Sequence, residues 1–186
     1  MSAIGCRWSG PANSIVIRSS FYVIDGYPLI PEELPAQFKA AMRRLAASVS
    51  IVVAKGDDGP VGIAATSITS LTVDPPALLV CVNRTTSLHA LLVPTAPLSI
   101  NLLGRDQKMI SAAFGGGAPR EERFRIGEWV DGGNGLPSLA GAQANMECVI
   151  DAMLAYGTHS IVIARVLRAR VSDGVDPLIY QDGGYL

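Results

Sequence analysis

Three strand-like runs, the first and third apolar and the second rich in hydroxyl residues, follow one another between residues 50 and 82, separated only by turn residues. The first run, 50–54, leads through Gly56-Asp57-Asp58-Gly59 into a second, and Asp74-Pro75-Pro76 ends that second run before the third, 77–82. Tight turns of this kind join antiparallel strands, whereas parallel strands need a crossover of a dozen or more residues. The succession therefore predicts antiparallel strands here and argues against a βαβ arrangement.

The rest of the chain continues this pattern with few helices. Helical spacing of apolar residues predicts a helix at 36–47, and Ser87 is expected to cap a short helix at 88–93. Another helix is expected at 107–114, ending at the glycines 115–117. Further strands are expected at 98–103, 144–150, 154–156, 160–171 and 178–180. Short strands with few helices predict a mainly β protein, an antiparallel barrel.

Composition narrows the class of protein. A chain of 186 residues, 49% of them hydrophobic, is long enough for one well-buried domain and excludes disorder for its bulk. The charged fraction is only 17%, which favours a surface partly covered by a second copy, so we expect a homodimer. The net charge of −1, with no basic stripe, argues against nucleic-acid binding.

The cysteines and the N-terminus indicate a reducing compartment. Cys6, Cys81 and Cys148 form no CxxC pair, and only His89 and His159 could join them as soft ligands, so no metal site is expected. No run approaches the roughly 18 apolar residues of a membrane-spanning helix. The first twenty residues lack the basic start of a signal peptide. We expect a cytoplasmic protein without a membrane partner.

Hydroxyl side chains gather beside the second and third runs. They belong to Thr66, Ser67, Thr69, Ser70, Thr72 and Ser87. Hydroxyls donate to carbonyl, ring-nitrogen or phosphate acceptors without bringing charge, and the small residues at 62–65 let the backbone approach a ligand closely. The pattern suits a planar polar ring with a phosphate rather than a protease or a metal site. An ordinary half-buried strand rich in threonine is the alternative.

The segment from Asn83 to Ser87 is the sequence's best candidate for a phosphate site. There a buried strand ends, donors follow, Arg84 adds a charge and a helix is expected to begin. The alternative is a capped helix with a surface arginine. The mixed-charge run 120–125 is interpreted as a solvated surface, and glycines 115–117 lack the spacing of a dinucleotide-binding fingerprint.

No catalytic constellation stands out among the polar residues. Neither a Ser-His-Asp order nor a carboxylate pair is present. His159 stands at the start of a strand, where it could touch a ligand or be structural, and His89 is expected at the surface. Phe124 and Trp129 are interpreted as core or pocket-wall aromatics.

Together these segments resemble the flavin reductase domain family, which has the FMN-binding split-barrel fold. The chain is most similar to small reductase components of two-component flavin monooxygenases, such as 4-hydroxyphenylacetate 3-monooxygenase. The matching pieces, in family order, lie at 38–45, 65–76, 79–87, 100–103, 121–124, 157–159 and 177–180. The resemblance implies two regions, an N-terminal extension at 1–34 and a flavin reductase-like domain at 35–186. It also implies a Greek-key split β-barrel, and a homodimer formed through the β-rich barrel, with the flavin near the subunit boundary.

The resemblance also implies binding roles for individual residues. The flavin-binding positions are Gly62, Ile63, Ala64, Ala65, Thr66, Ser67, Cys81, Val82, Asn83, Ser87, Leu88, Ala113 and Phe114. His159 matches the histidine of a Gly-Asp-His motif near the nicotinamide, although Thr158 replaces the aspartate here. No catalytic side chain is required, because the flavin itself accepts the hydride and the protein aligns two rings.

The expected function is therefore an NAD(P)H-dependent reductase of FMN or FAD that supplies a separate monooxygenase. Two alternatives remain: a flavoenzyme of the same fold reducing another acceptor, such as a cobalt corrinoid, and a flavin-binding protein without turnover. The residues do not distinguish FMN from FAD, or NADH from NADPH.

Overall fold

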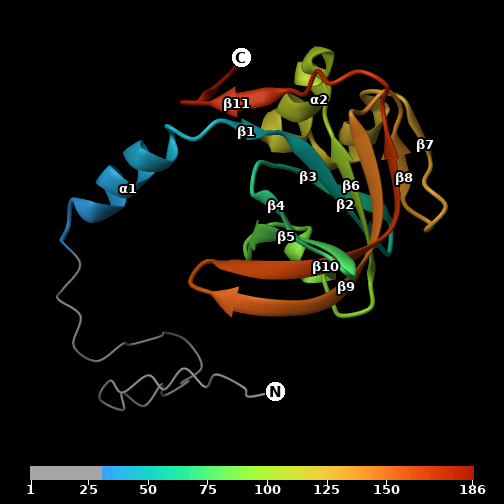
Figure 1. Cartoon of the computed structure of the whole chain (residues 1–186), viewed down its shortest axis with the longest axis horizontal. Coiled ribbons are helices and arrows are strands. Elements are labelled where there is room, and N and C mark those ends of the chain that lie inside the picture. The colour runs from blue at the N-terminus through green and yellow to red at the C-terminus, as the bar shows by residue number, and fades with distance from the viewer. Residues whose placement is uncertain (1–30) are drawn as a thin grey trace, which may run out of the picture.

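The computed structural model describes residues 31–186, which form one main antiparallel sheet with two small sheets beside it (Figure 1). The main sheet has the order β3-β2-β6-β9-β10-β5-β4. Its strands are β2 (Ser50–Gly56), β3 (Gly59–Ala65), β4 (Ile68–Val73), β5 (Pro76–Asn83), β6 (Pro97–Leu102), β9 (Ala144–Tyr156) and β10 (His159–Val171). The small sheets contain β1 (Ala47–Ser48), β11 (Ile179–Gln181) and β12 (Gly184–Tyr185), and β7 (Trp129–Asp131) and β8 (Pro137–Leu139).

Helices are few and short. They are α1 (Leu34–Met42) and α2 (Lys108–Ala112), with the single helical turns η1 (His89–Leu91), η2 (Arg105–Gln107), η3 (Ala113–Gly117) and η4 (Arg120–Arg125). The mainly β antiparallel fold is thus confirmed. Within residues 31–186, no helix has the length and hydropathy of a membrane span.

A long bent hairpin, β9 and β10, joins the two halves of the main sheet. The first part of β9 pairs with β6 and the first part of β10 pairs with β5, so the β5–β6 connection skips two strands. The register between β9 and β10 shifts near Ala164 and again near Arg168. Such bulges bend a strand and increase its twist. The sheet consequently curls into the predicted barrel, and the bend is visible in Figure 1.

The sequence predicted two strands, 144–150 and 154–156, where the structure has the single strand β9. The predicted gap begins at Asp151, and aspartate is a residue type depleted in strands. On this exposed part of the hairpin its carboxylate instead accepts hydrogen bonds from Arg165 of β10, at 3.1–3.3 Å. A cross-strand ion pair therefore lets the strand continue through an acidic residue.

Strand β2 is buried on both faces, which explains its uninterrupted apolar sequence. Val52 and Ala54 belong to one core cluster, together with Val80, Val82 and Ile100 among others. Residues on the other face of β2 belong to a second cluster with Leu103, Ile110 and Phe114. A strand between two cores reads as a continuous apolar run rather than an alternating one.

Helix α1 is shorter than predicted and extends away from the barrel (Figure 1). The sequence predicted a helix over 36–47, but the structure ends it at Met42, because Ala47 and Ser48 pair with β11. No residue of α1 is buried, and Phe38 is 63% exposed. The predicted extension, 1–34, lies outside the described residues except at its C-terminal end.

Candidate functional site

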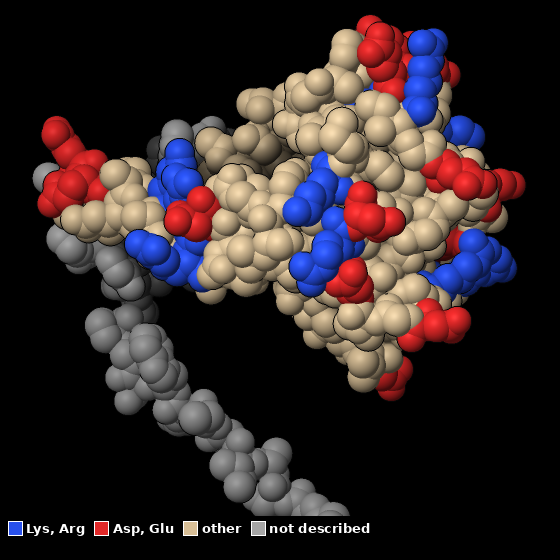
Figure 2. Space-filling view, turned by 90° about the horizontal axis from the view of Figure 1, so that it is seen from above, with Lys and Arg blue, Asp and Glu red and all other residues tan. Residues whose placement is uncertain are grey.

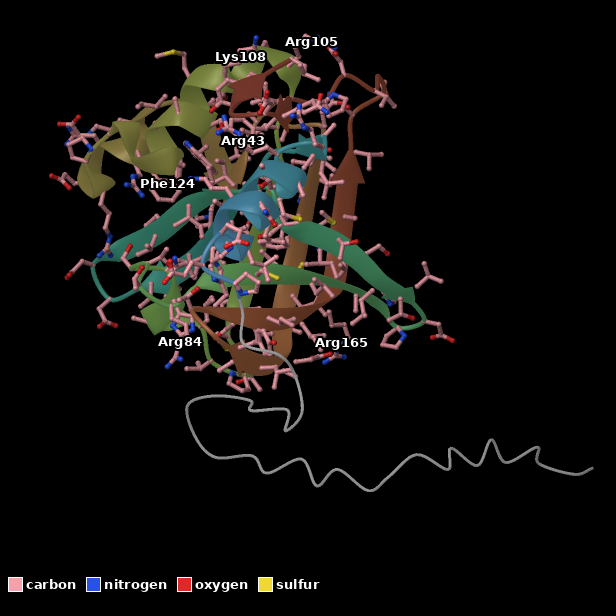
Figure 3. All side chains as sticks on the ribbon, turned by 90° about the vertical axis from the view of Figure 1, so that its left-hand side faces the viewer. Arg43, Arg84, Arg105, Lys108, Phe124 and Arg165 are labelled. Carbon is pink, nitrogen blue, oxygen red and sulfur yellow. The ribbon has the colours of Figure 1, made fainter. Side chains whose placement is uncertain are left out.

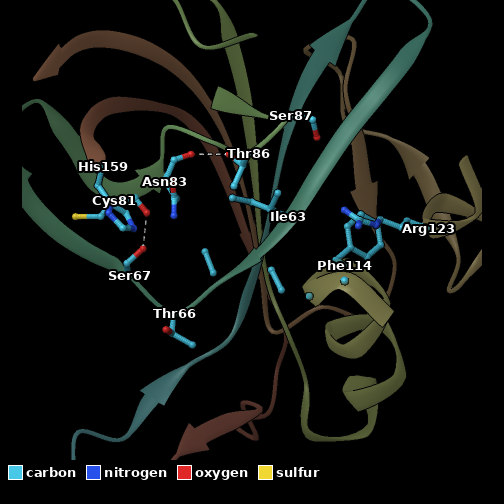
Figure 4. A pocket seen from close by; sticks show the side chains of 14 residues that line it. Ile63, Thr66, Ser67, Cys81, Asn83, Thr86, Ser87, Phe114, Arg123 and His159 are labelled. Atoms are coloured by element: carbon cyan, nitrogen blue, oxygen red, sulfur yellow. Dashed lines mark hydrogen bonds between the residues drawn. The ribbon is translucent and has the colours of Figure 1, made fainter. Parts of the chain in front are cut away.

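The end of β3, the end of β5, the start of β10 and the helical turn η3 surround a cavity of about 550 Å³ (Figure 4). Ten of the residues predicted to bind a ligand line it: Ile63, Ala64, Ala65, Thr66, Ser67, Cys81, Asn83, Ser87, Phe114 and His159. They come from four separate parts of the chain, so the fold brings together what the sequence placed up to a hundred residues apart.

Strand pairing explains much of this convergence. In the β5–β10 register His159 lies opposite Asn83, and Ile161 lies opposite Cys81. Ser67 is joined to the same strand, because its hydroxyl donates to the Cys81 carbonyl at 2.8 Å and its own carbonyl accepts from the Cys81 amide. The hydroxyl segment, the end of β5 and His159 therefore meet at one edge of the barrel.

The four other residues predicted for the site do not line the cavity. Val82 and Leu88 point into the core and are fully buried, and Ala113 is 5% exposed. At Gly62, a Cβ would lie 2.5 Å from Phe114 Cε1, so this glycine is needed for the aromatic ring to pack closely. These positions shape the cavity from behind rather than form its surface.

Sequence reasoning missed Gly115, Gly116 and Arg123, which line the cavity, and it included Thr86 only as part of the candidate phosphate segment 83–87. The charge run 120–125 was interpreted as a solvated surface, yet the half-buried Arg123 points inward (Figure 4). Its Nε donates to the Ala118 carbonyl at 3.1 Å and its Nη1 to the Gly62 carbonyl at 3.2 Å. The available signal was its neighbour Phe124, an aromatic residue in a charged run.

An aromatic cluster holds Arg123 in this position. Phe114, Phe124 and Trp129 pack with ring centroids 5.0–5.4 Å apart, in tilted or edge-to-face geometry. Phe124 and Trp129 do not line the cavity and pack against the second core cluster, so of the two predicted roles the core role is confirmed. The cluster fixes the helical turn η4 that carries the arginine.

Arg84, the cation predicted for a phosphate, does not line the cavity. Its Nη1 approaches the Gly157 carbonyl at 3.5 Å, and Figure 3 places it with Arg165 at the end of the molecule opposite Arg43 and Lys108. Within the described part of the chain, Arg123 is the one lysine or arginine that lines the cavity. A positive charge is therefore present, but it comes from a different segment.

The predicted cap at Ser87 is wrong. The following helix is the three-residue turn η1, and the side chain bonded to its first amide is Thr86, whose Oγ1 lies 3.3 Å from the His89 nitrogen. Thr86 Oγ1 also donates to the Asn83 carbonyl at 2.8 Å. So short a turn has almost no dipole, and the argument from a helix N-terminus fails. The Ser87 side chain stays available at the cavity.

Several polar groups at the cavity have no hydrogen-bond partner within residues 31–186. Asn83 Oδ1 accepts from Thr85, which leaves the Nδ2 amide of Asn83 unpaired. His159 uses Nδ1 with Thr158 Oγ1, at 2.9 Å, which leaves its Nε2. The Thr66 and Ser87 hydroxyls complete this set of polar groups, which can recognise a polar ring.

His89 is not the surface residue that the sequence suggested. It is half-buried, and its Nε2 lies 2.9 Å from the buried Ser160 hydroxyl, next to His159 in the chain. The hydrogen bond joins the segment after β5 to the start of β10. His89 therefore supports the cavity wall without lining it.

The cavity offers no acid–base pair for catalysis. Its lining, drawn from residues 31–186, contains no carboxylate, and that part of the chain holds no group of three or more potential metal ligands. The Cys148 thiol lies in the core, where burial, and secondarily Glu147, raises its pKa to about 12. What the arrangement can do is bind and orient a flat polar molecule that carries an anionic group.

Comparison with known proteins shows which family the chain belongs to. Residues 42–186 match the model of the family described as flavin reductase like domain. The reductase component of an FADH₂-dependent resorcinol hydroxylase from Rhizobium sp. is 40% identical over 84% of this chain and 89% of its own. The FMN reductase (NADH) RutF of Stutzerimonas stutzeri is 38% identical over 85% of this chain and 88% of its own.

Among solved structures, the styrene monooxygenase flavin reductase of Pseudomonas putida superimposes with a TM-score of 0.73 at 28% identity. The match covers 81% of this chain and 96% of that reductase. The family model covers most of the chain, and both curated relatives exceed 30% identity over most of its length. The chain belongs to the flavin reductase like domain family.

Proposed function

We propose that the chain binds FMN or FAD in the cavity between β3, β5 and η3 and reduces it with NADH or NADPH for a separate monooxygenase. Reduction of FMN with NADH is the activity named for the RutF relative, and a separate monooxygenase is in keeping with the resorcinol hydroxylase relative, which is named as a reductase component. The observation that carries the proposal is a cavity whose lining, drawn from residues 31–186, combines unpaired polar groups with one arginine and contains no carboxylate.

The two ends of the cavity match the two ends of a flavin, its ring and its phosphate. Ser67, Asn83 and His159 lie on one side of Figure 4, and Ser87 and Arg123 lie on the other. We assign the first group to the ring and the second to the phosphate, because a guanidinium binds phosphate strongly. Gly115 and Gly116 have open space where a Cβ would stand, so backbone alone faces the ligand there.

When bound, the flavin supplies the hydride-accepting ring, and the protein's residues position the two rings. His159 Nε2 is left for the nicotinamide carboxamide, which offers both a donor and an acceptor, because Thr158 occupies the other ring nitrogen. Asn83 is held by Thr85, so its amide is fixed before a ligand binds. No side chain needs to act as a general base.

We also propose that two copies associate through α1 and the uncharged surface near it. Leu34, Phe38, Met42 and Leu45 are all more than 40% exposed, and Figure 2 shows wide areas without charged side chains between the charged groups. A helix with an uncovered apolar face is usually covered by a partner. Light scattering should give a dimer mass at micromolar concentration, and a monomer mass for Phe38→Asp.

The decisive experiment is an anaerobic assay of NADH and NADPH oxidation with added free FMN or FAD. Rapid turnover with free flavin, giving reduced flavin in solution, is expected. Turnover only after addition of another acceptor, such as a cobalt corrinoid, would favour a different flavoenzyme. Flavin binding without any turnover would favour a non-catalytic flavin-binding protein.

A further inference from the structure

The small sheet of β7 and β8 lies beside the barrel in Figure 1 and is not part of its strand ladder. One edge of β8 faces β7, where the Ala140 amide donates to the Glu128 carbonyl at 2.8 Å. On the other edge, both backbone groups of the buried Leu139 bond to asparagine side chains. Buried backbone groups require partners, so these side chains take the place of a neighbouring strand.

The two asparagines are Asn101 of β6 and Asn145 of β9, called the amide pair below. Asn101 Oδ1 accepts from the Leu139 amide at 2.9 Å, and Asn145 Nδ2 donates to the Leu139 carbonyl at 3.1 Å. The two side chains also bond to each other at 2.8 Å, and the fully buried Asn101 donates to the Ile51 carbonyl at 3.3 Å. The amide pair therefore fastens β8 to three strands of the barrel, β2, β6 and β9.

From β8 a continuous path of contacts leads to Arg123. Leu139 lies opposite Trp129 in the β7–β8 register. Trp129 Nε1 donates to the Ile126 carbonyl at 3.0 Å, and the Ile126 amide donates to the Arg123 carbonyl at 3.1 Å. The Trp129 ring also packs against Phe124, the next residue after Arg123. Each step from the amide pair to the arginine is thus a hydrogen bond, a strand pairing or a ring contact.

We propose that the amide pair and Trp129 position Arg123 for the flavin phosphate. The inference rests on the proposed flavin reductase function. Arg123 belongs to the 3₁₀ turn η4, and such a turn has weaker hydrogen bonds than an α-helix, so its direction depends on what holds its ends. Neither Trp129 nor the amide pair lines the cavity, so these residues act through Arg123 and not on the ligand.

Support of the fold alone is the alternative explanation. A buried amide network stabilises the barrel, and its loss then lowers stability without favouring one ligand over another. A positioning role predicts a selective loss, because only a ligand with a phosphate uses the arginine. The ratio of the affinities for FMN and riboflavin, which lacks the phosphate, distinguishes the two explanations.

Fluorescence titration of the full chain with FMN and riboflavin tests the proposal. Trp129→Phe keeps an aromatic ring and removes the Nε1 donor, so it should weaken FMN about threefold and leave riboflavin nearly unchanged. Asn145→Leu removes two donated bonds and should weaken FMN about threefold to tenfold, again with little effect on riboflavin. Tyr185→Phe is the matched control, since it removes an aromatic donor whose partner is Ser111, and it should leave the ratio unchanged.

Combination with Arg123→Gln shows whether these residues act through the arginine. In that background neither Trp129→Phe nor Asn145→Leu should weaken FMN further, because effects that pass through one group do not add. Additive losses, or a wild-type ratio in both single variants, would overturn the proposal. Failure of wild type to bind FMN would instead reject the proposed function. Urea unfolding separates lost affinity from misfolding, and Trp129→Phe decides alone if Asn145→Leu does not fold.

Discussion

The two ends of the main cavity are built differently. The proposed ring end, with Ser67, Asn83 and His159, stands where paired strands begin or end. The proposed phosphate end, with Ser87 and Arg123, stands on a turn and a short helical segment. Strand register fixes the ring end, whereas side-chain packing around Phe114 fixes the phosphate end.

The two ends of the cavity are expected to respond differently to mutation. A donor on a hydrogen-bonded ladder keeps its place when one neighbour changes, because many backbone bonds hold it. Arg123 depends on two carbonyl partners and on an aromatic cluster. We therefore expect the loss of Arg123 to reduce function more than the loss of one donor at the ring end.

The largest effect is expected for Arg123→Gln. Loss of a charged hydrogen bond to phosphate should weaken FMN binding roughly tenfold to a hundredfold and leave riboflavin much less affected. Fluorescence titration with both ligands measures this. Arg84→Gln is the matched control, since Arg84 lies outside the cavity, and it should change neither affinity. Equal losses for FMN and riboflavin would remove Arg123 from the phosphate site.

A smaller effect, confined to the ring end, is expected for His159→Ala. The KM for NADH should rise and kcat/KM should fall by about fivefold to thirtyfold, as for one lost hydrogen bond. The affinity for FMN should stay nearly unchanged. Steady-state kinetics and flavin titration of one preparation provide both numbers. Lost flavin affinity or lost stability, with nucleotide kinetics intact, would show that His159 is structural.

The difference between the two ends of the cavity also explains which parts of the fold and the site are predictable from the sequence. The barrel, the hairpin around 56–59 and the ring-end residues follow from local patterns that strand pairing carries into three dimensions. Arg123 could not be found this way, because a charge run gives no period and its inward direction depends on the packing of Phe124. The role of Thr86 was missed because Ser87, one residue later, fits the same capping pattern.

The two errors in the predicted fold lie where local sequence preference was followed. The predicted division of strand β9 falls at Asp151, a residue type that is rare in strands, and in the structure the ion pair with Arg165 of β10 lets the strand continue. The helix at 36–47 was extended past Met42 because apolar spacing continues to Leu45, whereas pairing with β11 takes over at Ala47. In both cases a contact distant in sequence overrides a local preference.

A still smaller effect separates Ser87 from Thr86. Ser87→Ala should weaken FMN by about threefold relative to riboflavin and leave stability unchanged, because Ser87 caps no helix. Thr86→Ala should lower the free energy of unfolding by about 1 kcal/mol, since it removes the bond to the His89 amide. Urea unfolding and flavin titration of both variants test this. The reverse pattern would restore the capping role of Ser87.

The last prediction compares the two described cysteines, Cys81 at the cavity and Cys148 in the core. Burial raises the pKa of the Cys148 thiol from 9.0 to about 12, so the native state keeps a proton that the unfolded chain loses above pH 9. The unfolded state then binds fewer protons, and the free energy of unfolding falls as the pH rises from 9 towards 12. The slope from this one group is at most about 1.4 kcal/mol per pH unit. Urea unfolding at pH 8 and pH 10 should show a smaller decrease for Cys148→Ala than for wild type, and Cys81→Ala is the control that keeps the wild-type decrease. An unchanged decrease in Cys148→Ala would mean that other groups govern alkaline stability.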